Sequence, residues 1–342
     1  MRIHLHSLQP GATGHSDPGY LLTPDRWAAA YARAQKAGHE GARQEGTGHE
    51  VTFGDTPEAL AVGLLHAEAL VTQTSALARC LPMPPAPHLR LIYCTAAGLD
   101  GLAPFTWLPA GVQLLNNRGT HGEKAGEYGL MALLMLANQM PAYATAQRAG
   151  QWASGPHGGM LAGRRLLVVG LGTLGGAIAE RASAAGVVVT GMRTTASPHP
   201  ACAHVIDPSG LDAALPNADY VVLSTPLTPQ TQGLLDRRRI ALLPPGAGVI
   251  NIGRGALLDQ DALCDALDAR ALGGAVLDVF VPEPVPPGHR LWTTRNLIMT
   301  PHMSADDPAS YVSRSLDIFF ANLTAWREGR PLPNRFEVAR GY

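Results

Sequence analysis

Three loops in the second half of the chain carry an arginine, a carboxylate and a histidine that together could reduce a carbonyl group. They are Asn251 to Gly255 with Arg254, Asp278 to Pro284 with Glu283, and Thr300 to Ser304 with His302. A guanidinium binds a carboxylate through two hydrogen bonds and polarises the neighbouring carbonyl, while an imidazolium donates a proton. A carboxylate beside the imidazole would hold it and raise its pKa. These residue types suit the reduction of a 2-keto acid.

Each side chain also has an ordinary structural interpretation. Arg254 could cap a helix, Glu283 could be a solvated loop acid, and His302, one of thirteen histidines, could satisfy a backbone group. We favour a shared site because all three would follow strands of one parallel sheet. Ligands bind outside the carboxyl ends of such strands.

A glycine-spaced turn precedes these loops. The apolar strand expected at Arg164 to Val169 leads into Gly170-Leu171-Gly172-Thr173-Leu174-Gly175. In this pattern the first glycine allows a tight turn, the second lets the backbone approach a pyrophosphate, and the third lets the following helix pack closely. The pattern alone is weak, because the chain holds 38 glycines. A helix at Leu174 to Ala185 and a strand at Val187 to Thr190 supply the βαβ unit that the motif requires.

The elements that must position these residues follow from the apolar pattern. From about residue 165 to 300, short apolar runs alternate with amphipathic stretches, which predicts a parallel sheet covered by helices. Further strands are expected at Tyr220 to Leu223, Gly248 to Ile252, Gly274 to Leu277 and Leu297 to Met299. The first 115 residues predict a smaller α/β domain, with strands at Ala69 to Thr72 and Leu89 to Cys94. Helices are expected at Glu123 to Asn138 and Pro308 to Arg327, and the second could return to the first domain.

Composition narrows the class of protein. The chain has 342 residues, 46% of them hydrophobic, which favours two domains. A net charge of -1 gives no electrostatic case for nucleic acid. No run of eighteen apolar residues and no apolar N-terminal block appear, so we expect no membrane association and a cytoplasmic location. The widely separated Cys80, Cys94, Cys202 and Cys264 predict buried free thiols and no metal site.

Taken in order, these motifs resemble the D-isomer-specific 2-hydroxyacid dehydrogenase family, in particular its glyoxylate/hydroxypyruvate reductase-like members. The resemblance runs from about Leu89 to Asn334. It is carried by the glycine turn, Pro226 to Thr231, Asn251 to Gly255, Gly273 to Phe280 and Pro301-His302. It implies a Rossmann doubly wound nucleotide domain at residues 117–302 and a smaller flavodoxin-like α/β substrate domain at 1–116 and 303–342. It also implies a homodimer formed through the nucleotide domain.

The resemblance assigns roles to individual residues. Arg254, Glu283 and His302 would be the catalytic residues, and the backbone N–H groups of Ala97 and Gly98 would hold the substrate carboxylate beside Arg254 and His302. Asp278 and Pro226 would line the nicotinamide side. Cofactor contacts are also expected at Gly170, Gly172, Thr173, Leu174, Gly175, Arg193, Thr194, Thr225, Thr231 and Ile252.

The chain departs from the family at two positions near the expected domain boundary. Gly122 stands where the family usually has threonine, and Arg118 stands where it often has proline. Arg118 could add a positive charge near the mouth of the site or be a solvated surface residue. The first 88 residues match no family motif, so the sequence leaves the substrate open.

The second strand of the βαβ unit bears on the choice of cofactor. NAD-specific folds of this type place an acid roughly 20 residues beyond the glycine turn, where it binds ribose hydroxyls. Here no acid occurs between Glu180 and Asp207, and the strand ends at Met192-Arg193-Thr194. An arginine in that place can pair with a 2′-phosphate. We therefore predict that NADP(H) is preferred over NAD(H).

The leading hypothesis is hydride transfer between NADP(H) and a small 2-keto acid or D-2-hydroxy acid, as in glyoxylate/hydroxypyruvate reductases. A D-3-phosphoglycerate dehydrogenase is a weaker alternative, because the chain ends shortly after the dehydrogenase motifs, without room for the regulatory domain that many such enzymes append. Formate or phosphite oxidation on this fold stays open. A dinucleotide-sensing, corepressor-like binding protein is the alternative from a different class.

Overall fold

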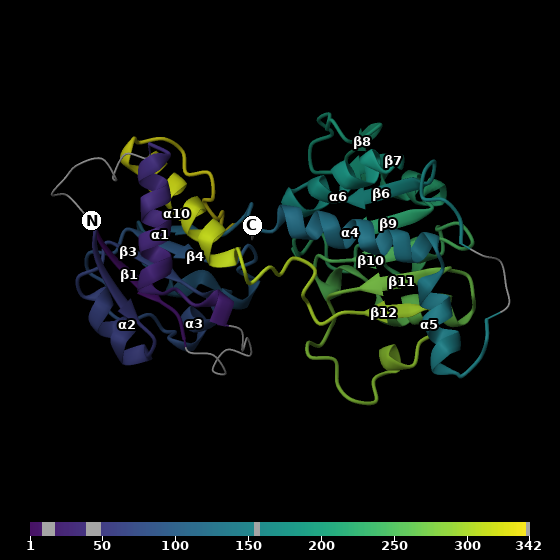
Figure 1. The fold of residues 1–342 in the computed structure, drawn as a ribbon, viewed down its shortest axis with the longest axis horizontal. Helices are drawn as coiled ribbons and strands as arrows, with labels where there is room; N and C mark the ends of the chain where they lie inside the picture. The colour runs from purple at the N-terminus through teal and green to yellow at the C-terminus, as the bar shows by residue number, and fades with distance from the viewer. Residues whose placement is uncertain (9–17, 39–48, 154–157, 340–342) are drawn as a thin grey trace. The chain divides into compact units, whose positions relative to one another are not determined.

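The computed structural model describes residues 1–8, 18–38, 49–153 and 158–339. The chain forms two compact units, one of Met1–Thr120 with Asp307–Tyr342 and one of His121–Asp306. Each holds a parallel sheet with helices (Figure 1), so the predicted α/β fold class is confirmed. The functional domain division at 116/117 and 302/303 stays a prediction, and the compact units exchange at 120/121 and 306/307.

Seven parallel strands form the sheet of the second unit, in the order β12-β11-β10-β9-β6-β7-β8. Their bounds are β6 Arg165–Val169, β7 Val188–Met192, β8 His204–Ile206, β9 Tyr220–Leu223, β10 Gly248–Asn251, β11 Gly274–Leu277 and β12 Leu297–Met299. Sequence order reverses between β6 and β9, which is the switch point where doubly wound sheets bind ligands at the carboxyl ends of their strands.

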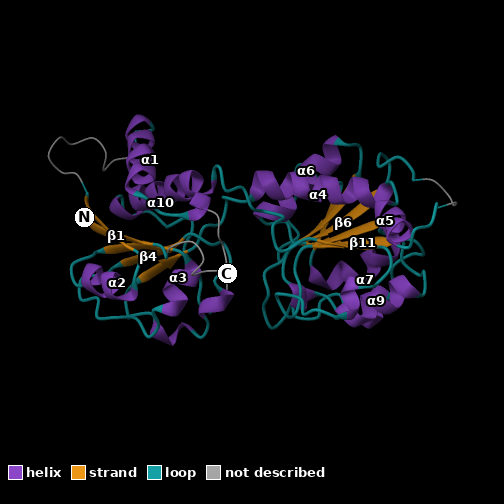
Figure 2. Ribbon diagram, turned by 60° about the horizontal axis from the view of Figure 1, so that its bottom comes forward, coloured by secondary structure: helices purple, strands orange, loops and turns teal. Residues whose placement is uncertain are grey.

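Helices cover both faces of this sheet (Figure 2). One face carries α4 (Gly122–Ala137), α5 (Met140–Arg148) and α6 (Thr173–Ala184), and the other carries α7 (Leu211–Ala214), α8 (Arg237–Ile240) and α9 (Gln260–Asp268). Alternate residues of β6 enter opposite cores, Leu166 with α4 and α6, and Leu167 with α7 and α9. Because both faces are buried, the strand is apolar throughout rather than alternating.

The first unit holds five parallel strands in the order β2-β1-β3-β4-β5, which is a flavodoxin-like arrangement. The strands are β1 Arg2–His6, β2 Glu50–Gly54, β3 Ala69–Thr72, β4 Leu91–Cys94 and β5 Gln113–Leu115. Helices α1 (Pro24–Lys36) and α10 (Tyr311–Arg327) cover one face, and α2 (Pro57–Leu64) and α3 (Thr74–Arg79) cover the other. The ring of Trp27 on α1 lies 4.9 Å from that of Phe320 on α10. The C-terminal helix α10 thus packs in the same hydrophobic core as the N-terminal helix α1.

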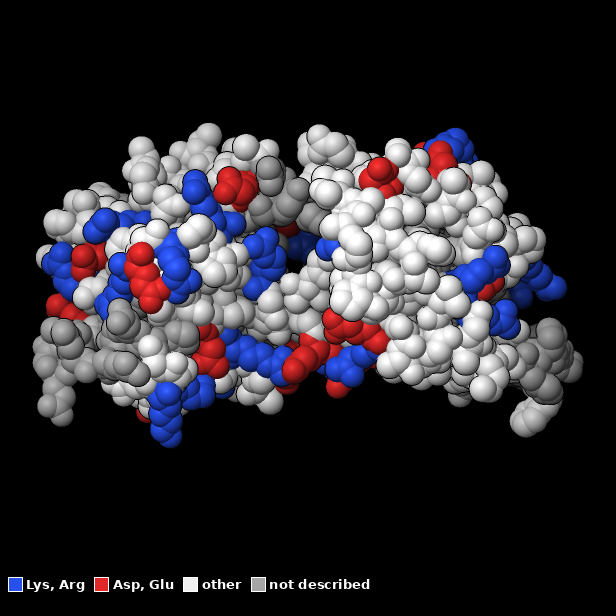
Figure 3. Space-filling view, turned by 90° about the horizontal axis from the view of Figure 1, so that it is seen from above, with Lys and Arg blue, Asp and Glu red and all other residues white. Residues whose placement is uncertain are grey.

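Charged side chains of both signs lie among many uncharged ones on the face seen in Figure 3. Within the described ranges, no helix combines the length and apolar character needed to cross a bilayer.

Candidate active site

The glycine turn joins β6 to α6 with the geometry that a dinucleotide needs. Gly170 has a φ of +105°, which favours glycine. A Cβ at Gly175 would lie 1.8 Å from the Gly170 carbonyl oxygen, so only glycine lets the helix pack there. A Cβ at Gly172, the residue that precedes α6, would meet nothing within 4 Å. The turn therefore leaves open space before the helix N-terminus, where N–H groups attract a phosphate.

Ser224, which the sequence analysis did not single out, secures this turn from β9. Its hydroxyl donates to the Gly170 carbonyl oxygen over 2.8 Å. Thr225, the next residue, packs its methyl group close to Gly170, and its buried hydroxyl has no hydrogen-bond partner among the described residues. No sequence signal marked Ser224, because its role depends on β9 lying beside β6.

The other expected cofactor residues follow the carboxyl ends of the sheet strands, but their side chains differ in position. Thr231 folds back on its own loop, since its hydroxyl donates to the Pro226 carbonyl over 2.7 Å. Ile252 is buried in the core, which leaves its backbone for any contact. Thr173 and Leu174 open α6 and are partly buried.

Arg193 follows β7 and closes a short loop. Its Nε and one terminal nitrogen donate to the Ser197 carbonyl over 3.1 and 2.5 Å, and the same terminal nitrogen reaches the Pro198 carbonyl over 2.8 Å. Thr194 is exposed beside it. The arginine thereby fixes the shape of the loop after the strand.

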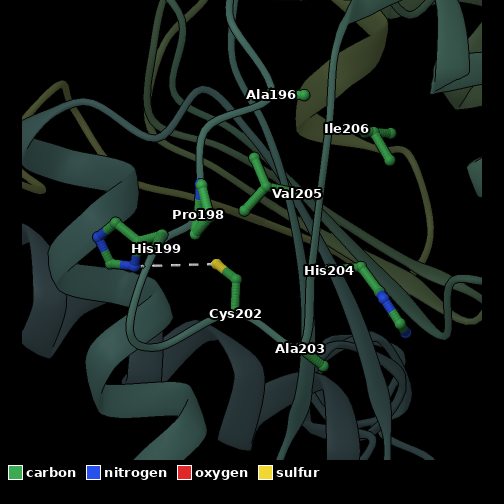
Figure 4. Close-up of a pocket in the computed structure, with 8 residues that line it drawn as sticks. All are labelled: Ala196, Pro198, His199, Cys202, Ala203, His204, Val205 and Ile206. Atoms are coloured by element: carbon green, nitrogen blue, oxygen red, sulfur yellow. Dashed lines mark hydrogen bonds between the residues drawn. The ribbon is translucent and has the colours of Figure 1, made fainter.

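A pocket of about 460 Å³ lies between this loop and β8 (Figure 4). Pro198 is part of its wall, and its polar side chains are His199, Cys202 and His204. The His199 Nδ1 and the Cys202 Sγ are 3.9 Å apart. Since Arg193 binds the Pro198 carbonyl, it shapes one side of this pocket.

His302 and Glu283 form an ion pair at the edge of the sheet. The imidazole Nδ1 lies 2.8 Å from Glu283 Oε2, and the other carboxylate oxygen accepts the Phe280 N–H over 2.6 Å. The bond to Glu283 raises the pKa of His302 against the opposing effect of burial. Burial raises the pKa of Glu283, but the bonds from His302 and Phe280 outweigh it and leave that pKa lowered. The pair favours an imidazolium beside a carboxylate.

Arg254 stands between β10 and a short 3-10 helix at Gly255–Leu257, with an extended backbone. The buried Asn251 holds its loop, because the Asn251 amide donates to the Arg254 carbonyl over 2.9 Å. A Cβ at Gly255 would lie 2.2 Å from the Phe280 carbonyl carbon, so the Arg254 loop packs against the Glu283 loop. The positive charge of Arg254 contributes to the lowered pKa of Glu283 and opposes the rise in the pKa of His302.

The carboxylate of Asp278 holds the loop that carries His302. It is fully buried and accepts from the Thr300 hydroxyl over 2.5 Å and from the Met303 and Ser304 N–H groups over 2.9 Å each. The nicotinamide contact that the resemblance implies for Asp278 stays a prediction, whereas these three hydrogen bonds of its carboxylate hold the loop of His302.

The residues expected to hold the substrate carboxylate, Ala97 and Gly98, belong to the first unit and follow β4. The Asn116 side chain donates to the Ala97 carbonyl over 2.9 Å, and the Asn117 N–H donates to the Ala96 carbonyl, also over 2.9 Å. Two asparagines thus shape this loop.

The two departures from the family have local explanations. A Cβ at Gly122 would lie 3.0 Å from the Thr173 methyl group, so a larger residue there would crowd the first turn of α6. The Arg118 guanidinium donates to the Pro333 carbonyl over 2.6 Å, within the first unit. Arg118 therefore ties the C-terminal segment to the end of β5.

Cys80, Cys94 and Cys264 are buried free thiols, as predicted, whereas the free thiol Cys202 is partly exposed, because it lies in the loop between β7 and β8. Among the described residues, no group of three or more metal-binding side chains comes together.

Comparison with known proteins places the chain in a family. The family model described as "D-isomer specific 2-hydroxyacid dehydrogenase, NAD binding domain" matches residues 130–304. D-3-phosphoglycerate dehydrogenase of Mycobacterium bovis is 31% identical over 259 residues, which cover 75% of this chain and 49% of that protein. The chain thus spans about half the length of that curated relative.

Solved structures cover nearly the whole chain. A D-isomer specific 2-hydroxyacid dehydrogenase family protein of Aeromonas salmonicida is 30% identical with a TM-score of 0.77, covering 98% of this chain and 99% of that one. The NADPH-dependent glyoxylate/hydroxypyruvate reductase of Sinorhizobium meliloti, solved with NADP and sulfate, is 25% identical with a TM-score of 0.76, covering 100% and 99%.

A doubly wound sheet with a glycine turn, and a histidine–glutamate pair at the same edge, define a protein of the nicotinamide-dinucleotide-binding dehydrogenase class. The chain belongs to the D-isomer specific 2-hydroxyacid dehydrogenase family, which confirms the resemblance seen in the sequence.

Proposed function

We propose that this protein transfers a hydride between NADP(H) and a small 2-keto acid, forming the D-2-hydroxy acid where the product is chiral. The observation that carries the proposal is the 2.8 Å contact between His302 and Glu283, with the charge of Arg254 beside it. All three lie on loops at the carboxyl edge of the sheet that also bears the glycine turn. A histidine without a catalytic role would not need the charged side chains of Glu283 and Arg254 near it.

The reaction balances with these residues. A reduced nicotinamide cofactor, held at the glycine turn, would supply the hydride that the keto carbon accepts. Arg254 binds the substrate carboxylate and polarises the carbonyl, and the imidazolium of His302 gives its proton to the oxygen as negative charge develops there. Glu283 stabilises the imidazolium before the transfer. The products are a hydroxy acid, the oxidised cofactor and a neutral imidazole.

The same proposal gives the remaining predicted residues their roles. The first unit acts as the substrate domain, with the N–H groups of Ala97 and Gly98 on the carboxylate. In the second unit, Gly172 and the start of α6 hold the pyrophosphate, and Thr225, Pro226 and Asp278 lie toward the cofactor. The open space at Gly172 and the close packing at Gly175 support this assignment.

We infer that NADP(H) is preferred. Two observations support this: Arg193 directly follows β7, where NAD-specific folds carry an acid, and the exposed Thr194 hydroxyl lies next to it in sequence. The similarity to a reductase described as NADPH-dependent points the same way. Arg193→Asp should lower the NADPH preference in kcat/KM by at least roughly tenfold. An unchanged NADPH/NADH ratio would reject the role of Arg193.

The first experiment follows NADPH and NADH absorbance with glyoxylate, hydroxypyruvate, pyruvate and bulkier 2-keto acids. Turnover with NADPH supports the proposal, and His302→Ala should then reduce kcat by roughly two to four orders of magnitude. The exposed His88→Ala serves as the matched control. Cofactor binding without turnover of any keto acid would favour a formate or phosphite oxidation, or a dinucleotide sensor.

A second candidate activity is the oxidation of D-3-phosphoglycerate, which the 31% identity to the Mycobacterium bovis enzyme favours. The same assay with D-3-phosphoglycerate and oxidised cofactor separates the two. Faster turnover there than with the keto acid panel would replace the leading proposal.

We further propose that the protein is a homodimer joined through the second unit. Two apolar side chains one turn apart on α4 stand exposed, Met131 at 38% and Leu134 at 44% of their free exposure. Stable soluble proteins rarely leave such side chains together without a partner. The cytoplasmic location expected from the sequence stays a prediction.

A further inference from the structure

The structure contains a buried hydroxyl chain behind the loop of His302 that the proposed reaction does not explain. We propose that Tyr128, acting through Thr300 and Asp278, is a positioning residue that holds His302 in place for proton transfer. This inference rests on the proposed function, because it gives a task to the general acid of that reaction.

The series of hydrogen bonds begins at Tyr128 on α4 and ends at Asp278 in the loop after β11. The Tyr128 hydroxyl lies 2.6 Å from Thr300 Oγ1, and Thr300 donates to Asp278 Oδ1 over 2.5 Å. A hydroxyl has a single proton, so a threonine that donates to the carboxylate must accept from the tyrosine. The direction of both bonds is thereby fixed.

Asp278 connects the two hydroxyl groups to the backbone around His302. Its side chain accepts the Met303 and Ser304 N–H groups, and its main-chain carbonyl accepts the His302 N–H over 2.9 Å. These bonds matter because His302 has a φ of +54°, a left-handed conformation that residues with a Cβ rarely adopt. The hydrogen bonds that Asp278 accepts from the N–H groups of Met303, Ser304 and His302 itself hold that conformation.

Packing alone does not require the Tyr128 hydroxyl. The ring is buried in the apolar core under α4 and α6, where a phenylalanine would fill the same space. A buried phenol needs a hydrogen-bond partner, and Thr300 is the one that the structure provides. Burial also raises the pKa of Tyr128 to about 12, so the phenol keeps the proton it donates.

Three variants and one control test the inference. Tyr128→Phe removes only the hydroxyl, Thr300→Val removes the link to Asp278, and Thr300→Ser restores it. Tyr220→Phe is the matched control, because Tyr220 lies in the same core but at the amino end of β9, away from the carboxyl edge. Two readouts are compared in the full-length protein: kcat and KM with NADPH and a keto acid, and deuterium exchange of peptides covering residues 300–306 without substrate.

We expect Thr300→Val to lower kcat by roughly tenfold to a hundredfold and Tyr128→Phe by roughly threefold to tenfold, with KM for NADPH unchanged. Exchange in residues 300–306 should rise in the same order. Thr300→Ser and Tyr220→Phe should stay within roughly twofold of the wild type in both readouts.

Unchanged exchange in both Thr300→Val and Tyr128→Phe would overturn the inference, and so would equal losses in Tyr220→Phe. A wild-type protein that reduces no keto acid, but whose loop still loosens in Thr300→Val, would instead reject the proposed function while supporting the hold on the loop.

Discussion

His302 owes its raised pKa chiefly to one neighbour, Glu283. Its Nδ1 bonds Glu283, which leaves Nε2 as the nitrogen that can present a proton to a substrate. Glu283 is itself held by the Phe280 N–H, so the carboxylate cannot turn away without losing a second bond. The acid is therefore oriented before any substrate arrives.

The pH dependence of reduction tests this pairing. Reduction needs the protonated imidazole, so kcat/KM falls as pH rises through the raised pKa of His302. Glu283→Gln keeps an oxygen acceptor but removes the charge, and the alkaline limb should move to lower pH by about one unit. Glu127→Gln, a change at an exposed carboxylate of the same unit, is the control. An unmoved limb would show that Glu283 does not set this pKa.

At the scale of elements, the turn between β6 and α6 offers a matched pair of glycine variants. Gly175→Ala forces a Cβ to within 1.8 Å of the Gly170 carbonyl, and should reduce the free energy of unfolding by about 1–3 kcal/mol or more. Gly172→Ala meets no neighbour within 4 Å and should leave the melting temperature unchanged. Its methyl group fills the space in front of the helix, so NADPH affinity should fall at least roughly tenfold. Calorimetry measures the stability of both variants, and titration measures their NADPH affinity. A Gly172→Ala protein that binds NADPH as tightly as the wild type would show that the pyrophosphate does not bind in front of this helix.

Strand β1 makes the first unit sensitive to acid. Burial, with a smaller effect of His6, lowers the pKa of His4 to about 4. Its Nδ1 bonds the Thr52 hydroxyl over 2.8 Å, and Gly63 provides the space for its ring. An unfolded chain binds the proton below pH 6.5, whereas the folded chain stays neutral until about pH 4. The free energy of unfolding should therefore decrease as the pH is lowered from 6.5 to about 4, by about 3 kcal/mol from His4 alone.

Urea unfolding between pH 7.5 and pH 4.5 measures this slope. His4→Asn should be less stable at neutral pH, because it leaves space beside Gly63, but its stability should change less with pH. His88→Asn, at an exposed histidine of the same unit, should keep the wild-type slope. Equal slopes in all three proteins would mean that His4 titrates normally in the folded state.

At the scale of the whole molecule, the exposed face of α4 is the surface through which we propose that two copies of the protein associate. Tyr128 points into the core from α4, while Met131 and Leu134 stand exposed on the same helix. A charge at Leu134 should convert the proposed dimer to a monomer in light scattering. Val62→Glu, at an exposed apolar position on α2 of the other unit, should not change the mass. A wild-type monomer at micromolar concentration would reject the dimer.

The sequence anticipated the second unit better than the first. Tyr220–Leu223, Gly274–Leu277 and Leu297–Met299 form strands with the predicted bounds, because strands buried on both faces are continuous apolar runs. Strand β1 escaped notice because His4 and His6 interrupt its apolar pattern, and both are nevertheless buried.

The sequence by itself determined the class of fold, the glycine turn and the family, since these depend on local periodicity and on motifs in a fixed order. It also proposed Arg254, Glu283 and His302, because each follows a strand. Only the tertiary structure showed what holds them. The Ser224 and Tyr128 contacts join segments that are brought together by strand order and helix packing. Sequence spacing cannot encode such contacts, because they form between elements rather than within them.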